Sequence, residues 1–230
     1  MRISVPSRNL MQFKDKMARA IGQQDIPGLR WLLEGFNMYD LFANFPIFDE
    51  KINKSGIFTC SYDKERVKEV GPDRAAAEWI VRCEGSVKFD RIEDVFTDYN
   101  ALIKRCAELD PRVPADDVRV VLIDATDSCV TGYGCKHFEN LRGIQEVRFV
   151  RCRNLHDWGL EIMADHVGDR LQFLEIDSCP RITEFGIKHL HRCKALKSLL
   201  LANLKSVHGK DKVLGELEQA LPNTKITSKL

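Results

Sequence analysis

Oxygen-bearing side chains gather in one short segment, residues 123–129, which reads Ile-Asp-Ala-Thr-Asp-Ser-Cys. The segment follows an apolar run, so we expect it at the end of a β-strand. Its carboxylates, Asp124 and Asp127, and its hydroxyls, Thr126 and Ser128, could coordinate a hard cation through oxygen. The same residue types after a strand also satisfy the backbone amides of a turn. Both interpretations stay open on the sequence.

Thiols and histidines suggest no further chemistry. The eight cysteines contain no C-x-x-C pair, which argues against a zinc site or a disulfide framework and predicts reduced, buried thiols. His189 and His191 are expected on a helix surface rather than as metal ligands. No phosphate-binding loop, nucleophile elbow or zinc-protease motif occurs, so we expect a protein that is not an enzyme.

Charge excludes one class of partner. The chain carries 35 basic and 34 acidic side chains, a net charge of +1, whereas a nucleic-acid binder needs a basic excess. No apolar run is long enough for a transmembrane helix. Residues 1–24 differ from the rest, because they contain five basic residues and a single acidic one, Asp15, interspersed with apolar residues. This composition predicts a mitochondrial transit peptide, with a disordered basic tail as the alternative.

Residues 61–117 are expected to form a helical N-terminal capping domain. A short charged helix is predicted over 62–70, and Gly71-Pro72-Asp73 predicts the start of the next one, with proline at its first position. Residues 86–89 alternate as a strand does, and residues 92–109 are predicted to be helical. Apolar residues at helical spacing predict the buried face of the second helix: Ala76, Trp79, Ile80 and Cys83.

From about residue 118 the pattern L-x-x-L-x-L-x-x-C recurs. Its cysteine place is taken by Thr126, Cys152, Cys179 and Leu204, which are 26, 27 and 25 residues apart. Such a period is typical of leucine-rich repeats, whose strand–turn–helix units stack around a continuous core. The two central copies also share a glycine followed by an apolar residue, Gly159-Leu160 and Gly186-Ile187.

The predicted fold class is therefore α/β: a short solenoid of about four cysteine-type leucine-rich repeats behind the helical cap. The repeats would occupy residues 118–230, with a helix over 212–221 and a strand over 225–227 closing the end. Residues 25–60 are rich in phenylalanine and show neither a helical nor a strand period.

Alternation along the predicted strands identifies an outward face. Val120 is also expected to point outward, and the central column is expected to read Leu122, Arg148, Glu175 and Leu200. Several outward residues are apolar, which is typical of an interaction surface. The alternative is that the phenylalanine-rich segment covers the face. The residues expected to bind a partner are Leu122, Arg148, Val150, Phe173, Glu175, Asp177 and Leu200.

Three stretches resemble one family. They are residues 70–79 (Val-Gly-Pro-Asp-Arg-Ala-Ala-Ala-Glu-Trp), residues 123–129, and the repeats ending near Leu221-Pro222. Over roughly residues 61–230 the chain resembles the coupling factor B family of mitochondrial ATP synthase, also called subunit s. The resemblance implies a helical domain and four leucine-rich repeats in a non-enzymatic protein, peripherally bound to the matrix side of the inner mitochondrial membrane. It further implies binding to membrane-sector subunits of the synthase and support for coupling proton flow to ATP synthesis.

Two other functions stay open. A related branch assembles the membrane arm of respiratory complex I, whose assembly intermediates would then be the partners. A substrate receptor of a ubiquitin ligase is the other alternative, but it needs an F-box-like helical segment that we do not find. Residues 38–60 look inserted relative to the family, either as a docking loop or as translated intron sequence.

The resemblance also implies a magnesium site. Its ligands would be a main-chain carbonyl at Glu84, next to Gly85, and the hydroxyl of Thr126. Mammalian members have glycine at the carbonyl position, and a main-chain ligand tolerates that difference. Their Cys-x-Cys pair is absent here, because Val150 stands two residues before Cys152. Dithiol chemistry is therefore not expected.

Overall fold

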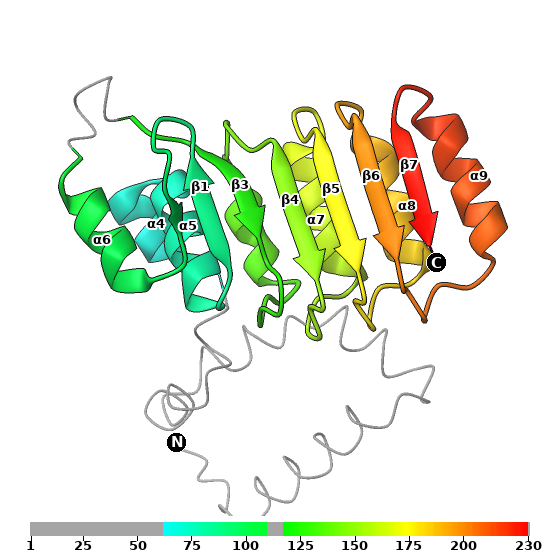
Figure 1. The fold of residues 1–230 in the computed structure, drawn as a ribbon, viewed down its shortest axis with the longest axis horizontal. Helices are drawn as coiled ribbons and strands as arrows, with labels where there is room; N and C mark the ends of the chain where they lie inside the picture. Colours follow the sequence, from blue (N-terminus) through cyan, green and yellow to red (C-terminus); the bar gives the residue numbers. More distant parts are fainter. Residues whose placement is uncertain (1–61, 110–116, 230) are drawn as a thin grey trace, which may run out of the picture. The chain divides into compact units, whose positions relative to one another are not determined.

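The computed structural model describes residues 62–109 and 117–229 (Figure 1). The predictions for residues 1–24 and 25–60 lie outside this part of the chain. The helices within it are α4 (Lys64–Val70), α5 (Pro72–Arg82), α6 (Tyr99–Ala107), α7 (Asp157–Val167), α8 (Glu184–His189), α9 (Lys210–Ala220) and the 3₁₀ turns η1 (Gly134–Phe138) and η2 (Leu190–Arg192). The strands are β1 (Ser86–Phe89), β2 (Val95–Phe96), β3 (Val120–Asp124), β4 (Glu146–Val150), β5 (Phe173–Asp177), β6 (Ser198–Ala202) and β7 (Lys225–Lys229).

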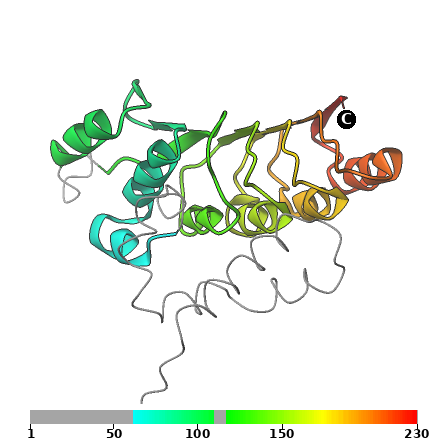
Figure 2. The ribbon, with the colours of Figure 1, turned by 90° about the horizontal axis from the view of Figure 1, so that it is seen from below.

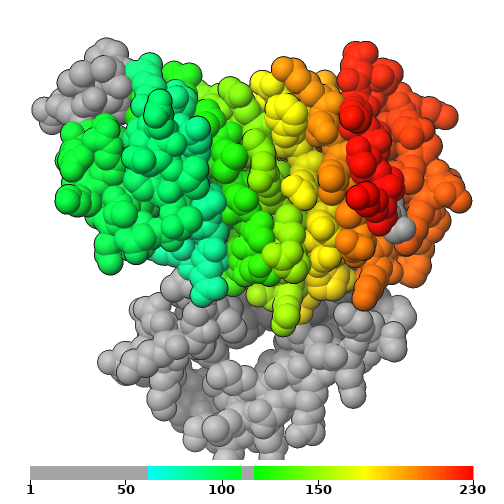
Figure 3. Space-filling view, in the orientation of Figure 1, coloured from blue at the N-terminus to red at the C-terminus, as the bar shows by residue number. Residues whose placement is uncertain are grey.

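The seven strands form one sheet in the order β2-β1-β3-β4-β5-β6-β7. Strands β3 to β7 are parallel, and β1 is antiparallel to both β2 and β3. Figure 2 shows that α7, α8 and α9 all lie on one side of this sheet. The other side of the strands, viewed directly in Figure 3, forms a broad surface with one strand beside the next. The predicted α/β class is confirmed as a mixed fold with a mostly parallel sheet.

Local sequence explains where the first helices begin. Asp63 caps α4 by accepting a hydrogen bond from the amide of Arg66 at 2.9 Å. Pro72 opens α5, and the predicted apolar face of that helix is buried. These two helices, the strand at 86–89, and the closing helix and strand at the C-terminal end are confirmed. The helix predicted over 92–109 is shorter, because β2 occupies its start and only α6 is helical.

A single apolar core lies between the sheet and the helices. Inward strand residues such as Val147, Phe149, Leu174 and Ile176 are no more than 2% exposed. Cysteines contribute to the same core, which confirms the expected burial for six of them. Cys129 is half-buried and disulfide-bonded, so the prediction of a reduced, buried thiol is wrong at that position. The thiols that the structure shows as free are all buried: Cys83, Cys106, Cys135, Cys152, Cys179 and Cys193. None of the helices described in residues 62–109 and 117–229 is long and apolar enough to cross a bilayer.

The cysteine place of the first copy is two residues later than predicted. Strand pairing sets Ile123 opposite Val147, and Ser128 rather than Thr126 then falls in the place of Cys152. Ser128 is buried, and its hydroxyl donates to the Ala125 carbonyl at 2.9 Å. The thiol of Cys152 donates to the same carbonyl, also at 2.9 Å.

Val120 was also expected on the outward face, and that prediction is wrong. The register between β1 and β3 shifts at Lys88/Phe89, where Phe89 pairs with Val120. A register irregularity of this kind changes the direction of the strand's side chains. Val120 is consequently fully buried.

A repeated turn ends the parallel strands together. Asp127, Arg151, Ser178 and Asn203 all have φ between 52° and 56°, the left-handed region. The amide of each donates to the carbonyl of the last residue of the next strand, as from Arg151 to Asp177 at 2.9 Å. These bonds extend the pairing of neighbouring strands one residue beyond the sheet and hold the outward side chains of adjacent strands in register.

Candidate partner-binding face and cation site

Strand register arranges the outward side chains in rows across the sheet. The central row is Ser86, Asp124, Arg148, Glu175, Leu200 and Thr227. The adjacent row is Lys88, Leu122, Glu146, Phe173, Ser198 and Lys225. The expected central column is therefore wrong in its first member. Asp124 stands beside Arg148, and Leu122 stands beside Glu146, because of the two-residue shift in the first copy.

Arg148 lies among three carboxylates. Its Nε donates to Glu146 Oε1 at 2.8 Å. Its Nη1 lies 3.7 Å from Asp124 Oδ2, and its Nε lies 3.9 Å from Glu175 Oε2. The hydrogen bond with Glu146 is the largest cause that raises the pKa of the Arg148 guanidinium above its usual value. Arg148 therefore organises the middle of the face, and its charge is already matched by its neighbours.

Apolar side chains adjoin this charged centre. Phe173 is 45% exposed, and Leu122 and Leu200 are half-buried. Val150, expected to line the same surface, is only 9% exposed and offers little area to a partner. The accessible apolar part of the face therefore centres on Phe173.

Asp177 lies in the next row with its carboxylate already bonded. Its Oδ1 accepts from Asn203 Nδ2 at 2.9 Å and from Ser178 Oγ at 2.8 Å. The Asn203 bond is the largest cause that lowers the pKa of this carboxyl below its usual value. Asp177 is therefore charged at neutral pH and adds to the acidity of the face.

The segment 123–129 uses its polar groups to shape a turn. The amide and the hydroxyl of Thr126 both donate to Asp124 Oδ1, at 2.9 and 2.6 Å. Asp127 points elsewhere and forms a two-bond pair with Arg151, at 2.6 Å for each bond. These contacts are those expected of a turn in which Asp and Thr side chains bond to nearby polar groups.

The residues implied for magnesium lie close together. A Cβ placed on Gly85 would be 2.7 Å from the Asp124 carbonyl oxygen, so this backbone approaches the 123–129 segment directly. The amide of Cys129 also donates to the Cys83 carbonyl at 3.0 Å. Glu84, between them, has φ of 67°.

The donors near this turn are oxygens. A main-chain carbonyl at Glu84 and the Thr126 hydroxyl fit a Mg²⁺ ion that keeps several of its waters. Within the described residues, no group of three or more His, Cys, Asp or Glu side chains is arranged to hold a metal. The magnesium site therefore stays a prediction.

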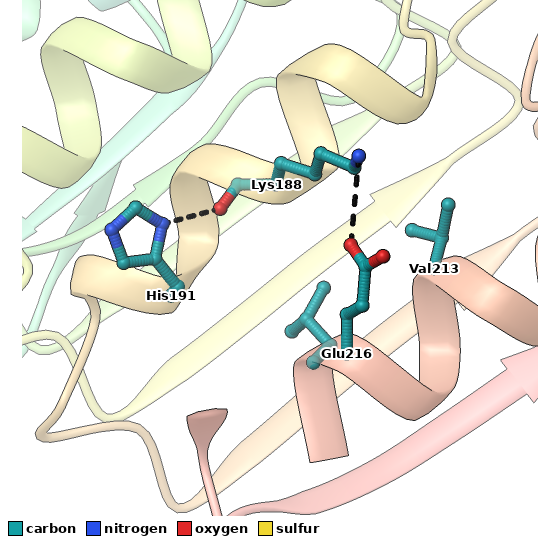
Figure 4. Close-up of a pocket in the computed structure, with 5 residues that line it drawn as sticks. Lys188, His191, Val213 and Glu216 are labelled. Carbon is teal, nitrogen blue, oxygen red and sulfur yellow. Dashed lines mark hydrogen bonds and ion pairs between the residues drawn. The ribbon is translucent and has the colours of Figure 1, made fainter. Parts of the chain in front are cut away.

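A separate hollow lies between α8, η2 and α9 (Figure 4). It measures about 250 Å³ and is lined by Lys188, His191, Val213, Glu216 and Leu217. Lys188 Nζ and Glu216 Oε2 are 3.5 Å apart across it, while His191 Nδ1 contacts the Lys188 carbonyl at 2.6 Å. Small-molecule sites usually measure roughly 300–1,000 Å³. We therefore place the candidate function on the sheet face rather than in this hollow.

Comparison with known proteins identifies relatives over most of the chain. No protein-family model matches. The chain is 34% identical to ATP synthase subunit s, mitochondrial, of Bos taurus over 166 residues, 71% of this chain and 79% of that protein. It is equally identical to the Homo sapiens protein of the same name over 170 residues, 73% of this chain and 81% of that protein. Distal membrane arm assembly component 2 of Drosophila melanogaster is 30% identical over 168 residues, which cover 70% of this chain and 55% of that protein. The extent and identity of the first two matches show that the chain belongs to the mitochondrial ATP synthase subunit s family.

Proposed function

We propose that the chain is a non-enzymatic accessory protein of mitochondrial ATP synthase. It would associate peripherally with the matrix side of the inner membrane, bind membrane-sector subunits, and support the coupling of proton flow to ATP synthesis. The observation that supports this most strongly is the match to proteins named as subunit s, which extends over 79% of the bovine protein. The proposed transit peptide at residues 1–24 agrees with that location.

We further propose that β3 to β7 and the segments that follow β3 to β6 are leucine-rich repeats. Three regularities support the assignment. Buried residues recur at the place of Cys152 and Cys179, the inward strand positions are apolar, and a left-handed residue follows the strands. The first unit is irregular, since the 3₁₀ turn η1 stands where α7 stands in the next one.

The binding surface in this proposal is the outward face of the sheet. Phe173 would supply the apolar contact, with Leu122 and Leu200 beside it, while Arg148, Glu175 and Asp177 would select a partner by charge. Aromatic residues in the middle of an interface often dominate its binding energy. The exposed ring of Phe173, next to an ordered ion cluster, is the feature of the described residues that best fits this role.

Affinity purification from mitochondria tests the proposal. Wild-type protein is expected to recover membrane-sector subunits of the synthase, and Phe173→Ala is expected to reduce that recovery about tenfold or more, as for a hot-spot residue. Phe185→Ala is the matched control, because Phe185 is also a surface phenylalanine, 59% exposed, but belongs to α8. Quantitative mass spectrometry measures recovery. Equal losses in the two variants would remove the support for the sheet face.

A role in assembling the membrane arm of complex I is the second candidate. It is favoured by the match to the Drosophila distal membrane arm assembly component 2, of which the chain spans about half. The same purification separates the two functions. Recovery of complex I membrane-arm subunits in place of synthase subunits would assign the protein to the assembly branch.

We also propose that Mg²⁺ binds at the Glu84 carbonyl and the Thr126 hydroxyl. A ligand that binds only the folded state raises its stability, so millimolar MgCl₂ is expected to raise the melting temperature of the wild type. Thr126→Val keeps the shape of the side chain, removes the hydroxyl ligand, and is expected to abolish the increase. Thr227→Val on β7 is the control and should keep it. An identical increase in Thr126→Val would contradict this site.

A further inference from the structure

The charges of the sheet face do not balance over its middle strands. Outward positions on β3, β4 and β5 carry four carboxylates, those of Asp124, Glu146, Glu175 and Asp177, against the single guanidinium of Arg148. The lysines of the face stand apart from the three carboxylates around Arg148, whereas Asp177 also interacts electrostatically with Arg151 and Lys229. Lys88 is on β1, and Lys225 and Lys229 are on β7, beyond β6, which contributes no charge. The centre is therefore acidic, although the whole chain has a net charge of +1.

Arg148 has little unmatched charge to offer an acidic partner. Three carboxylates already surround it, Glu146 accepts hydrogen bonds from both its Nε and its Nη2, and the side chain is 43% exposed. The carboxylates of Asp124, Glu146 and Glu175 share this one guanidinium. Their remaining oxygens are the groups that a partner can reach. Attraction between unlike charges at a partly desolvated surface favours a positively charged group there.

The apolar residues limit what that group is. Phe173 stands between Glu146 and Ser198 in its row, and Glu175 is two residues further along the same strand. Neighbouring strands lie about 4.8 Å apart and residues two apart along a strand about 6.6 Å, so Phe173 lies within roughly 10 Å of the two nearest carboxylates, those of Glu146 and Glu175. A segment that combines lysine or arginine with an apolar side chain matches this spacing, since helix positions three or four residues apart are about 5–6 Å apart.

Other occupants fit the face less well. A bare divalent cation would meet the guanidinium of Arg148 at the centre of the cluster. Nucleic acid and anionic lipid headgroups would be repelled by the surplus carboxylates. We propose that the outward face of β3–β6 binds a positively charged protein segment of its partner, with Phe173 against an apolar side chain and the surplus carboxylates against lysine or arginine. This proposal rests on the proposed function only in taking the sheet face as the binding surface.

Peptide selection on the full-length protein tests the inference. The probes are three pools of peptides with equal length and apolar content, which carry Lys/Arg, Asp/Glu or Gln at the variable positions. The wild type is expected to retain the Lys/Arg pool several-fold over the Gln pool, less strongly as salt rises. Glu146→Gln/Glu175→Gln should remove most of this preference. The matched control is Glu218→Gln, which neutralises an exposed glutamate on α9, and it should retain the preference. Circular dichroism and thermal melting show that each variant is folded.

Two results would overturn the inference. The first is equal retention of the three pools, or preference for the Asp/Glu pool. The second is a preference that appears only after the bases of residues 1–24 are replaced by glutamine, which would mean that the chain's own basic segment fills the face. If the selection fails while Phe173→Ala still lowers recovery of synthase subunits from mitochondria, the partner chemistry is wrong and the proposed function stands. If the Lys/Arg preference holds but no synthase subunits are recovered, the partner chemistry stands and the proposed function is wrong.

Discussion

Alanine at Gly159 is expected to lower the free energy of unfolding by about 1–3 kcal/mol, the usual cost of overpacking a core. A Cβ there would lie 3.0 Å from the Cα of Gly132, 3.1 Å from Cys135 Sγ and 2.7 Å from Leu155 Cδ1. The leucine side chain can rotate, but the backbone at Gly132 cannot move without separating α7 from the segment that contains η1. Urea denaturation measures the change.

Gly215 provides the matched control for this prediction. It lies inside α9, and a Cβ placed on it would have nothing within 4 Å. Alanine there removes conformational freedom from the unfolded chain and is expected to stabilise the protein by about 0.5–1 kcal/mol. The same chemical change should therefore have opposite signs at the two glycines. A stabilising effect at Gly159 would contradict the close packing of α7 on η1.

Stability is expected to fall between about pH 4 and pH 7 because of Asp73. This side chain accepts a hydrogen bond from the Val120 amide at 2.8 Å. Its burial raises the pKa of the carboxyl from 3.8 to about 6. A carboxyl with a higher pKa in the folded state than in the unfolded state binds its proton more firmly when folded. Its contribution to stability is complete below pH 4, is lost as the pH rises through about 6, and amounts to about 3 kcal/mol at most.

Asp73→Asn should remove this pH dependence. The amide oxygen still accepts from Val120, but no charge has to be buried, so the variant is expected to be about 1–3 kcal/mol more stable than the wild type at pH 7.5. At pH 4 the two proteins should have nearly equal stability. Asp98→Asn is the control, because Asp98 is exposed and its Oδ1 accepts from the amide of Ala101 at 2.7 Å. Urea denaturation at both pH values measures the difference, and a destabilised Asp73→Asn at pH 7.5 would contradict the assignment.

Much of the fold follows from periodic burial. The positions of β4, β5 and β6 were predictable because inward residues such as Val147, Leu174 and Leu199 recur at a nearly constant interval in a continuous core. The start of α5 was predictable because Pro72 fits only the first turn of a helix. At these places the local residue preferences and the pattern of buried residues indicate the same element, so the sequence pattern alone predicts it.

The repeat pattern was placed two residues out of register on β3, because the burial of this strand depends on which strands pair with it. Thr126 and Ser128 are both small and polar, and the template alone does not distinguish them. Parallel pairing of β3 with β4, which sets Ile123 opposite Val147, decides the alignment. The small buried hydroxyl at position 128 was the available signal, since it takes the place of a buried thiol.

The candidate face was predictable as a set of residues but not as an electrostatic arrangement. Alternation correctly placed Arg148, Phe173 and Glu175 on one side of the sheet. The two-residue shift brings Asp124, rather than Leu122, beside Arg148 and thereby makes the centre acidic. Which charges are matched depends on register across strands, and that information is absent from a single repeat.

Site-specific cross-linking inside mitochondria tests the central claim most directly. A photo-reactive phenylalanine analogue replaces Phe173 in one full-length protein and Phe185 in another, and the cross-linked peptides are identified by mass spectrometry. We expect position 173 to cross-link to a membrane-sector subunit of ATP synthase, in a segment rich in lysine or arginine, and position 185 not to do so. Cross-links to the synthase from position 185 alone, or from neither position while the protein is imported and folded, would contradict the account.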